Sequence, residues 1–432
     1  MGRVRSARQL LPAARIRGRV AVPGDKSISH RALVLAAIAD GHCTITGRAV
    51  GEDQDSMLAC LRALGVSIED DGARTAVSGV GLRGLRSPEA ELDCGNSGAT
   101  MRFLTGLLAG VPGVEATLVG DASLSRRPMA RVAEPLRRMG ADVGTSPSGL
   151  PPISVRGQQL RGADHHLAIA SAQVKTAILL AGLNASEQTF IVGRDTGRDH
   201  TERMLRMLGV DIESGDAIRM RPPAAIPAFE IEVPGDPSSA AFWLVLAAAH
   251  RDAEVAVTGV DINPTRVAFL AVLRRMGAEI EVGDEAAAAG EPTATLTARS
   301  SQLRATEIEP EEVSALVDEI PILAVAAACA EGSSAFRGLG ELRLKETDRL
   351  EAVATQLRLM GMTIAVEGDD LLITGRRGLR GARVFSHGDH RMAMSLAVAA
   401  SLAAGVSEIE GAEAASVSYP GFFEVLDQLA GA

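Results

Sequence analysis

Hydrophobic and polar positions repeat along this chain in one phrase, Leu-Arg-x-(Leu/Met)-Gly, which ends a segment of helical periodicity. Five copies, spaced 68 to 84 residues apart, end at Gly65, Gly140, Gly209, Gly277 and Gly361. Each copy predicts an amphipathic helix whose final glycine adopts the left-handed backbone conformation that commonly ends a helix. Alternating residues such as 278–282 then predict a strand, and residues 422–429 resemble a degenerate sixth copy.

A second kind of segment interleaves with the first and is almost wholly apolar after a polar or small-residue start. Its copies begin near Lys26, Gly98, Ser171, Ser238, Asp318 and Asp389. Leu, Val and Ala on every side predict helices that are buried on all faces. The chain therefore consists of an α/β unit of about 70 residues that is repeated six times.

The buried helices decide between two architectures for such a repeat. A solenoid needs contacts only between neighbouring repeats and would not require six fully buried helices. We therefore expect two compact lobes of three units each, with each lobe wrapped around its own buried helices. The phrase Val22-Pro-Gly-Asp25 returns as Val233-Pro-Gly-Asp236, and these Pro-Gly pairs predict where the chain crosses between lobes.

The expected crossings lie near 23–25 and 234–237. The N-terminal lobe is predicted to contain residues 25–237, and the C-terminal lobe residues 1–24 and 238–432. If the buried helices of a lobe run in parallel, their N-termini gather on one face, where free N–H groups and helix dipoles attract anions. Two such faces predict a cleft for anionic ligands, although the chain carries a net charge of −10.

Composition limits the remaining classes of function. An acidic chain is a poor nucleic-acid binder, and no apolar run reaches the roughly 18 residues of a membrane helix. Four cysteines without a CxxC pair predict a reducing cytoplasm rather than a disulfide scaffold. The arginine-rich N-terminus has the composition of a transit peptide, but residues 16–22 already alternate like a strand, so we take it as part of the fold.

Two polar starts and one arginine in the first half are candidate anion-binding positions. Lys26 and Ser27 begin a helix on which Arg31 lies one turn later; a lysine there opposes the helix dipole, which an ordinary capped helix does not explain. Gly98 lies where small residues let backbone N–H groups approach a ligand, although a loop with an N-cap is the more common meaning. Arg127 precedes a proline and suits phosphate or carboxylate, or is simply an exposed basic residue.

Two further starts and one decoy complete this group of motifs. Ser171-Ala-Gln-Val-Lys175 can bind a polyol or phosphate, or act as an ordinary serine N-cap. Asp318 and Glu319 are expected to begin a buried helix, either as acids favoured by its dipole or as a general base. Residues 79–84 fit GxGxxG, but the flanks predict strands, so we reject a dinucleotide site.

The last charged runs suggest proton transfer beside an anion site. Lys345 and Arg349 are expected on one helical face with Glu346 beside them, although a solvated charged face is the usual meaning of such a run. The run Ser386-His-Gly-Asp-His-Arg391 has metal-like spacing, but the fixed cation Arg391 disfavours a second cation, so no metal is expected. Many cations and few nucleophiles indicate two anionic substrates gripped in a cleft, with one or two acids for proton transfer.

In chain order the motifs are Pro-Gly-Asp-Lys26-Ser-Ile-Ser-His-Arg31, Gly-Asn96-Ser-Gly98, Arg127-Pro-Met, Ser171-Ala-Gln173, Leu-Lys345-Glu-Thr-Asp-Arg349 and Gly-Asp-His-Arg391. Together they resemble the 5-enolpyruvylshikimate-3-phosphate synthase family, from about residue 16 to the C-terminus. Ser-Ala-Gln-Val-Lys175, Arg198-Asp-His-Thr and Asn263-Pro-Thr-Arg266 resemble its class II subgroup. The resemblance implies a two-lobed inside-out α/β barrel of the enolpyruvyl transferase type, with three repeats per lobe, that closes around its substrates.

The resemblance also implies roles for individual residues. For shikimate 3-phosphate it implies binding by Lys26, Ser27, Arg31, Ser171, Ala172, Gln173, Arg198, Asp318 and Lys345. For phosphoenolpyruvate it implies binding by Lys26, Gly98, Arg127, Gln173, Arg349 and Arg391. Asp318 is implied as the base for the shikimate 5-hydroxyl, Glu346 as the acid for the methylene carbon, and Lys26 as a third catalytic residue. No cofactor or metal is implied, and we expect a cytoplasmic monomer without nucleic-acid or membrane partners.

Two positions depart from the family pattern, and a third bears on inhibitor tolerance. Val417 stands three residues before Pro420, where some members carry a lysine, and Glu341 replaces an asparagine that is common four residues before Lys345. Gly98 is kept where glyphosate-tolerant members tend to have alanine, so the sequence leaves tolerance open.

Two rival functions remain at this point. The enolpyruvyl transferase that acts on UDP-N-acetylglucosamine has Lys-Asn at the first site and usually a loop cysteine, whereas this chain has Lys26-Ser27 and no cysteine between Cys94 and Cys329. A non-catalytic anion-binding scaffold would not require Asp318 and Glu346 beside the cations.

Overall fold

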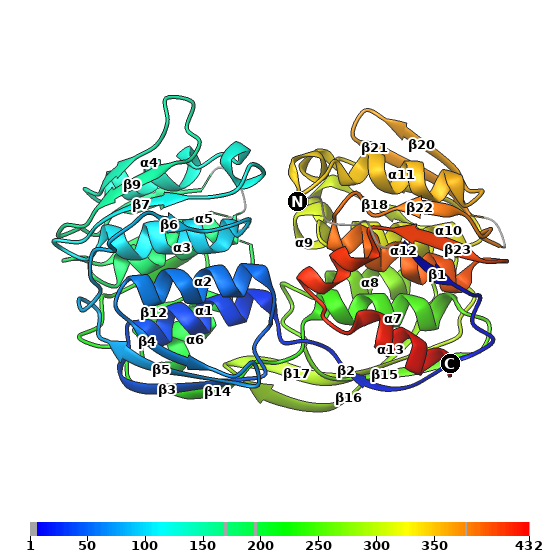
Figure 1. Cartoon of the computed structure of the whole chain (residues 1–432), viewed down its shortest axis with the longest axis horizontal. Helices are drawn as coiled ribbons and strands as arrows, with labels where there is room; N and C mark the ends of the chain where they lie inside the picture. The colour runs from blue at the N-terminus through cyan, green and yellow to red at the C-terminus, as the bar shows by residue number, and fades with distance from the viewer. Residues whose placement is uncertain (1–6, 168–170, 194–196, 376–377, 432) are drawn as a thin grey trace. The chain divides into compact units, whose positions relative to one another are not determined.

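The structure is a computed structural model that describes residues 7–167, 171–193, 197–375 and 378–431. Contacts along the chain divide it into two compact units (Figure 1), each of which is described by itself. The N-terminal unit contains Gly24–Pro234 and the short segment Ala287–Glu291. The C-terminal unit contains Met1–Pro23, Gly235–Ala286 and Pro292–Ala432.

The N-terminal unit alternates helices with short strands. Its helices are α1 (Lys26–Ala37), α2 (Glu52–Ala63), α3 (Gly98–Ala109), η1 (Leu124–Arg126), α4 (Ala130–Arg138), α5 (Ala172–Gly182) and α6 (His200–Met207). Its strands are β3 (Asp40–Thr46), β4 (Ser67–Asp70), β5 (Arg74–Val80), β6 (Leu92–Asp93), β7 (Glu115–Val119), β8 (Asp142–Gly144), β9 (Ile153–Arg156), β10 (Asp164–His166), β11 (Thr189–Val192), β12 (Ile212–Glu213), β13 (Ala217–Met220) and β14 (Glu230–Glu232). In the described part of the unit they form sheets of order β14-β3-β5-β4, β6-β7-β9-β8 and β10-β11-β13-β12.

The C-terminal unit is built in the same way. Its helices are α7 (Pro237–Ala249), α8 (Ala268–Arg275), α9 (Pro310–Leu316), α10 (Ile320–Cys329), η2 (Gly340–Leu344), α11 (Arg349–Leu359), α12 (His390–Leu402), η3 (Ala412–Val417) and α13 (Phe422–Ala430). Its strands are β1 (Ala7–Leu10), β2 (Ile16–Ala21), β15 (Ala253–Asp261), β16 (Glu279–Ala288), β17 (Glu291–Arg299), β18 (Glu307–Ile308), β19 (Gly332–Phe336), β20 (Thr363–Glu367), β21 (Asp370–Gly375), β22 (Arg383–Phe385) and β23 (Ser407–Glu410). Over the described residues the sheets have the orders β16-β17-β15-β2, β18-β19-β21-β20 and β1-β23-β22.

Among the described residues, each of these sheets contains a parallel pair of strands. Parallel pairs require a crossover connection, and α3 supplies it between β6 and β7, α5 between β10 and β11, and α12 between β22 and β23. The remaining strands, such as β8 and β9, continue the sheet in antiparallel fashion. In Figure 1 the sheet of β3, β4, β5 and β14 lies along one outer edge of the N-terminal unit, beside α1.

The six buried apolar helices that the sequence predicts are confirmed as α1, α3, α5, α7, α10 and α12, because most residues of each are buried. Small residues let these helices approach each other closely. A Cβ added to Gly106 of α3 would lie 2.2 Å from the carbonyl oxygen of Ala177 in α5, so only glycine fits that contact.

The predicted start of α10 is wrong. Asp318 and Glu319 do not open α10, which begins at Ile320 with Glu319 as its N-cap residue. The physical reason is Pro321, which fits the first turn of a helix, while Asp318 lies in the turn that follows α9.

The predicted helix-ending glycines are confirmed. Positive φ angles of 92°, 91°, 81°, 93° and 86° occur at Gly65, Gly140, Gly209, Gly277 and Gly361. The degenerate sixth copy is α13, which ends at Gly431 with φ 72°. Residues 79–84 open no helix: they end strand β5 and continue in a turn, so the strand predicted beside this segment is confirmed.

The arginine-rich N-terminus belongs to the fold from Ala7 onward. Strand β2 pairs in parallel with β15, and β1 pairs with β23. None of the helices in the described residues has the length and apolar character needed to cross a bilayer.

Candidate active site

The first turns of α1, α3 and α5 lie together in the N-terminal unit. Arg31 of α1 donates a hydrogen bond to Thr176 Oγ1 of α5 at 2.8 Å. Arg102 of α3 donates one to the side-chain oxygen of Gln173 in the first turn of α5. The convergence of helix N-termini that the sequence predicts is therefore confirmed within this unit, and it concentrates N–H groups at one place.

Lys26 is the first residue of α1. The carboxylate of Asp25 caps this helix by accepting a hydrogen bond from the Ile28 N–H at 2.8 Å. The ammonium of Lys26 forms an ion pair with Asp53 of α2. Sequence reasoning missed Asp53, because nothing in the local pattern indicates a partner that lies 27 residues further along the chain.

Arg31 is a buried cation held by neutral oxygen atoms. Its guanidinium donates to the Ser27 carbonyl at 2.8 Å and to Thr201 Oγ1 at 2.7 Å, besides Thr176. Burial lowers the pKa of Arg31 to about 10, so the group stays charged at neutral pH. Arg198 donates to Ser27 Oγ at 3.4 Å, which brings the two predicted phosphate-binding arginines to the same serine.

A fully buried ion pair supports the chain next to Arg198. Lys175 Nζ lies 2.6 Å from Glu202 Oε1, and neither side chain is more than 2% exposed. Lys175 also donates to the Gly197 carbonyl at 3.2 Å. Burial lowers the pKa of Lys175, while Glu202 opposes that shift. The motif around Ser171 contains Lys175, but only the fold reveals its partner.

Gly98 begins α3, and Arg127 lies beside it. A Cβ at Gly98 would lie 3.5 Å from Arg127 Nη1. Arg127 donates from Nη2 to Asn96 Oδ1 at 2.6 Å and from Nη1 to the Asn96 carbonyl at 3.3 Å. The Asn96 amide in turn donates to Asp121 at 2.6 Å. Gly98 and Arg127, which the sequence predicts at one site, are therefore close in space.

Ser171 is the N-cap residue of α5, and Ala172 and Gln173 form the first turn. Ser171 Oγ accepts a hydrogen bond from the Val174 N–H at 3.4 Å. This long contact is compatible both with an ordinary cap and with a hydroxyl that also meets a ligand.

The second group of predicted residues lies in the C-terminal unit, at the starts of α7, α10 and α12. Ser238 Oγ of α7 donates to the carboxylate of Glu319, the N-cap residue of α10. Arg391 of α12 donates to the Asp318 carbonyl at 2.9 Å, and its Nη2 lies 3.5 Å from Asp318 Oδ2. Helix starts therefore converge in this unit as well.

Arg349, the first residue of α11, is surrounded by carboxylates. Its Nε lies 2.7 Å from Asp389 Oδ2, its Nη2 2.5 Å from Glu346 Oε2 and its Nη1 3.8 Å from Asp318 Oδ1. Burial by itself would lower the pKa of Arg349, but Asp389 and the other two carboxylates raise it above the usual range. Asp389 also caps α12, so its place in the motif before Arg391 could have identified it as an N-cap.

The predicted helical face of Lys345 and Arg349 is wrong. Lys345 follows η2 in an extended conformation, and α11 begins only at Arg349 after the N-cap residue Asp348. Asp348 ends the preceding non-helical segment because its side chain accepts a hydrogen bond from the Glu351 N–H. Burial lowers the pKa of Lys345, and Asp318 opposes that shift. The charge of Asp318 still acts on both cations, although helical spacing does not bring them together.

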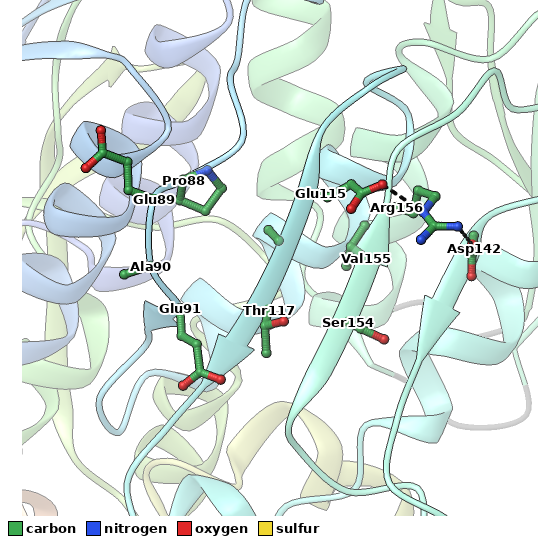
Figure 2. Close-up of a pocket in the computed structure, with 11 residues that line it drawn as sticks. Pro88, Glu89, Ala90, Glu91, Glu115, Thr117, Asp142, Ser154, Val155 and Arg156 are labelled. Atoms are coloured by element: carbon green, nitrogen blue, oxygen red, sulfur yellow. Dashed lines mark hydrogen bonds and ion pairs between the residues drawn. The ribbon is translucent and has the colours of Figure 1, made fainter.

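Two hollows in the N-terminal unit lie apart from all of these residues. Figure 2 shows the larger, of about 470 Å³, against β7 and β9, with Glu89, Glu91, Glu115 and Asp142 on its walls. Arg156 faces it but is paired with Glu115 at 3.0 Å. A wall rich in acids does not suit the anionic ligands that the helix starts indicate.

The fold and these two groups of side chains define a mixed α/β protein that presents arginine and lysine at helix starts, which suits anionic ligands. A family model described as EPSP synthase (3-phosphoshikimate 1-carboxyvinyltransferase) matches residues 11–426. The chain belongs to this family.

Its relatives agree along nearly the whole length. It is 49% identical over 426 residues to the 3-phosphoshikimate 1-carboxyvinyltransferase of Roseiflexus sp. (strain RS-1), covering 98% of both chains. It is 50% identical over 423 residues to that of Synechococcus sp. (strain RCC307), covering 96% of this chain and 97% of the relative. The solved EPSP synthase of Acinetobacter baumannii superposes with a TM-score of 0.89 at 40% identity, covering 99% of this chain and 98% of that one.

Proposed function

We propose that this chain transfers the enolpyruvyl group of phosphoenolpyruvate to the 5-hydroxyl of shikimate 3-phosphate and releases phosphate. The observation that carries the proposal is the family match over residues 11–426. The two groups of residues at helix starts support it, because both substrates are anions and the reaction needs proton transfer but no covalent nucleophile.

The residue roles follow the family pattern. Shikimate 3-phosphate would be bound by Lys26, Ser27, Arg31, Ser171, Ala172, Gln173, Arg198, Asp318 and Lys345. Phosphoenolpyruvate would be bound by Lys26, Gly98, Arg127, Gln173, Arg349 and Arg391. The contact of Arg198 with Ser27 Oγ at 3.4 Å supports a shared phosphate site. The position of Arg127 Nη1, 3.5 Å from where a Cβ at Gly98 would lie, supports a shared phosphoenolpyruvate site.

The proposed chemistry is addition followed by elimination. Glu346 delivers a proton to C3 of phosphoenolpyruvate while Asp318 takes the proton of the 5-hydroxyl, whose oxygen forms a bond to C2. The resulting tetrahedral intermediate then loses a proton from C3 and breaks its C2–O bond to phosphate. Charge stabilisation by Lys26 and the arginines supplies most of the rate enhancement. Glu346 lies 2.5 Å from Nη2 of Arg349. A substrate anion that binds Arg349 would replace the Glu346 carboxylate there, and Glu346 would then lie beside the substrate.

The architecture completes the proposal. We take the two units as the lobes of an inside-out α/β barrel with three repeats each. One lobe would contain residues 25–237 and the other residues 1–24 and 238–432. The lobes would close over the substrates and exclude water. The sheets of each unit and their buried helices support this. We propose a cytoplasmic monomer that acts on these small molecules without a cofactor or metal.

Phosphate release from phosphoenolpyruvate tests the function, with shikimate 3-phosphate and UDP-N-acetylglucosamine supplied separately. Turnover with shikimate 3-phosphate alone is expected. Turnover with the nucleotide sugar alone would show that the acceptor is UDP-N-acetylglucosamine and not shikimate 3-phosphate. Turnover with neither acceptor would overturn the proposed reaction. Lys26→Met should lose most turnover and keep its circular dichroism spectrum, since the Lys26 side chain is 32% exposed and is not part of the apolar core of its unit.

A further inference from the structure

Arg102 is a buried arginine that the proposed reaction does not use. It lies one turn into α3 and is 8% exposed. Its Nη1 donates to the side-chain oxygen of Gln173 and, at 3.4 Å, to the Gly98 carbonyl. Its Nε is buried and has no hydrogen-bond partner. A Cβ at Gly98 would lie 2.6 Å from Arg102 Nη1, so this guanidinium lies directly against the helix start.

The charge of Arg102 is not neutralised by the protein. Within the described ranges no carboxylate forms an ion pair with Arg102, or with its neighbours Arg127 and Arg131. Burial lowers the pKa of Arg102 to about 9, and the charges of Arg131 and Arg127 act in the same direction. A buried cation among like charges destabilises the fold unless an anion joins it.

Arg48 is a buried arginine of the same unit that has a purely structural role, and its partners can be compared with those of Arg102. Its side chain is 2% exposed and lies 2.5 Å from the Asp70 carboxylate. It also donates to Thr75 Oγ1 at 2.7 Å and to the Ala49 carbonyl at 2.8 Å. Arg48 is therefore fully satisfied without a ligand, whereas Arg102 is not.

We propose that Arg102 is a positioning residue for phosphoenolpyruvate, which orients Gln173 and Gly98 and adds a positive charge that only a bound phosphate or carboxylate balances. The identity of the anion rests on the proposed function. The need for an anion rests on the contacts and burial of Arg102 alone. Arg102 would act on phosphoenolpyruvate in two ways. It would hold the Gln173 amide, since hydrogen bonds from a charged donor fix an amide more strongly than neutral ones, and its positive charge would attract the anion.

The first experiment measures thermal unfolding of the full-length protein with and without phosphoenolpyruvate. Arg102→Gln should unfold at the wild-type temperature or above it without ligand, because it removes an unbalanced buried charge. It should also lose most of the rise that phosphoenolpyruvate causes in the wild type. The matched control Arg48→Gln should unfold at a lower temperature without ligand and keep that rise, because its partner Asp70 is left unpaired.

The second experiment measures steady-state turnover. Arg102→Gln should raise the KM for phosphoenolpyruvate at least about tenfold, the scale of one charged hydrogen bond, and change the KM for shikimate 3-phosphate less. Arg102→Lys should recover part of the loss, because it restores the charge but not both contacts.

Two results would overturn the inference. One is an Arg102→Gln protein that unfolds well below the wild type without ligand, as Arg48→Gln should, because Arg102 would then be structural. The other is an unchanged rise with phosphoenolpyruvate together with an unchanged KM. Failure of the proposed function would appear separately, as absent turnover in the wild type, while the unfolding measurement would still report on anion binding.

Discussion

Arg31, Arg102 and Arg127 of the N-terminal unit are held by hydroxyl, amide and carbonyl oxygens. Arg349 and Arg391 of the C-terminal unit lie against carboxylates instead. Neutral partners leave positive charge available for a ligand, whereas carboxylates cancel it until a ligand anion replaces one of them. The difference suggests that one unit mainly holds anions and the other mainly supplies the acids of the reaction.

The largest expected effect comes from removing an acid of the C-terminal unit. Glu346→Gln should lower turnover by about 100- to 10,000-fold, the usual contribution of a general acid. Its side chain is 32% exposed, so circular dichroism should be unchanged. Asp53→Asn, which removes the carboxylate beside Lys26 in the other unit, should cost far less turnover. Full activity of Glu346→Gln in a steady-state assay would remove that residue from the mechanism.

A second prediction concerns stability. Asp389→Asn keeps a helix-capping side chain but removes the fully buried carboxylate that pairs with Arg349, so the free energy of unfolding should fall by about 3 kcal/mol. Thr176→Val removes a neutral partner from Arg31 in the N-terminal unit and should cost only about 1 kcal/mol. Urea unfolding followed by far-UV circular dichroism measures both. Equal losses would show that the two units do not differ in this respect.

Acidification should act on the N-terminal unit through His30, which joins two helix starts. His30 Nδ1 lies 2.8 Å from the Lys26 carbonyl oxygen and Nε2 3.3 Å from Ser97 Oγ. Burial lowers the pKa of His30 to about 4, whereas the unfolded chain has an ordinary value near 6.5. Between these values the unfolded chain binds the extra proton, so stability decreases as pH falls through this window, by up to about 3 kcal/mol.

His30→Gln should remove part of that pH dependence, measured as unfolding free energy at pH 7 and pH 5. The remainder would come from His165, because burial lowers its pKa to about 4 as well. Exposed His42 provides a matched control, and His42→Gln should leave the slope unchanged. A slope that survives in His30→Gln at its full wild-type value would contradict the assignment.

The smallest expected effect concerns the departure at Val417, which lies half-buried at the end of η3 in the C-terminal unit. Val417→Lys would add a cation to the C-terminal unit, where carboxylates cancel the charges of Arg349 and Arg391. We expect the KM for phosphoenolpyruvate to fall only about threefold, the scale of one solvent-screened ion pair. Val406→Lys, at a 51% exposed position of the same unit, is the control. A higher KM in Val417→Lys would show that this position does not face the ligand.

Local features of the fold could be predicted from the sequence. A glycine after an amphipathic helix and an all-apolar helix are set by neighbouring residues, and Gly277 and α7 both follow the prediction. The helical face of Lys345 and Arg349 was predicted wrongly because Asp348 caps a new helix between them, a competing local signal.

Partners that meet through the fold could not be predicted. Arg349 meets Asp389 across 40 residues, and Lys175 meets Glu202 across two helices. Neither pairing has a periodic signal, because each depends on where whole helices lie. For the same reason, motifs identify the candidate residues of a site, but they do not reveal which cations are neutralised.

Incorporation of solvent deuterium tests the division of roles most directly. The wild type, Glu346→Gln and Arg102→Gln are each incubated in D2O with both substrates, and deuterium at C3 of the enolpyruvyl product is measured by NMR. Protonation and loss of a proton at C3 predict deuterium in the wild-type product. We expect Arg102→Gln, at saturating phosphoenolpyruvate, to match the wild type per turnover, and Glu346→Gln to lose both turnover and exchange. A wild-type product without deuterium, or normal exchange in Glu346→Gln, would contradict the account.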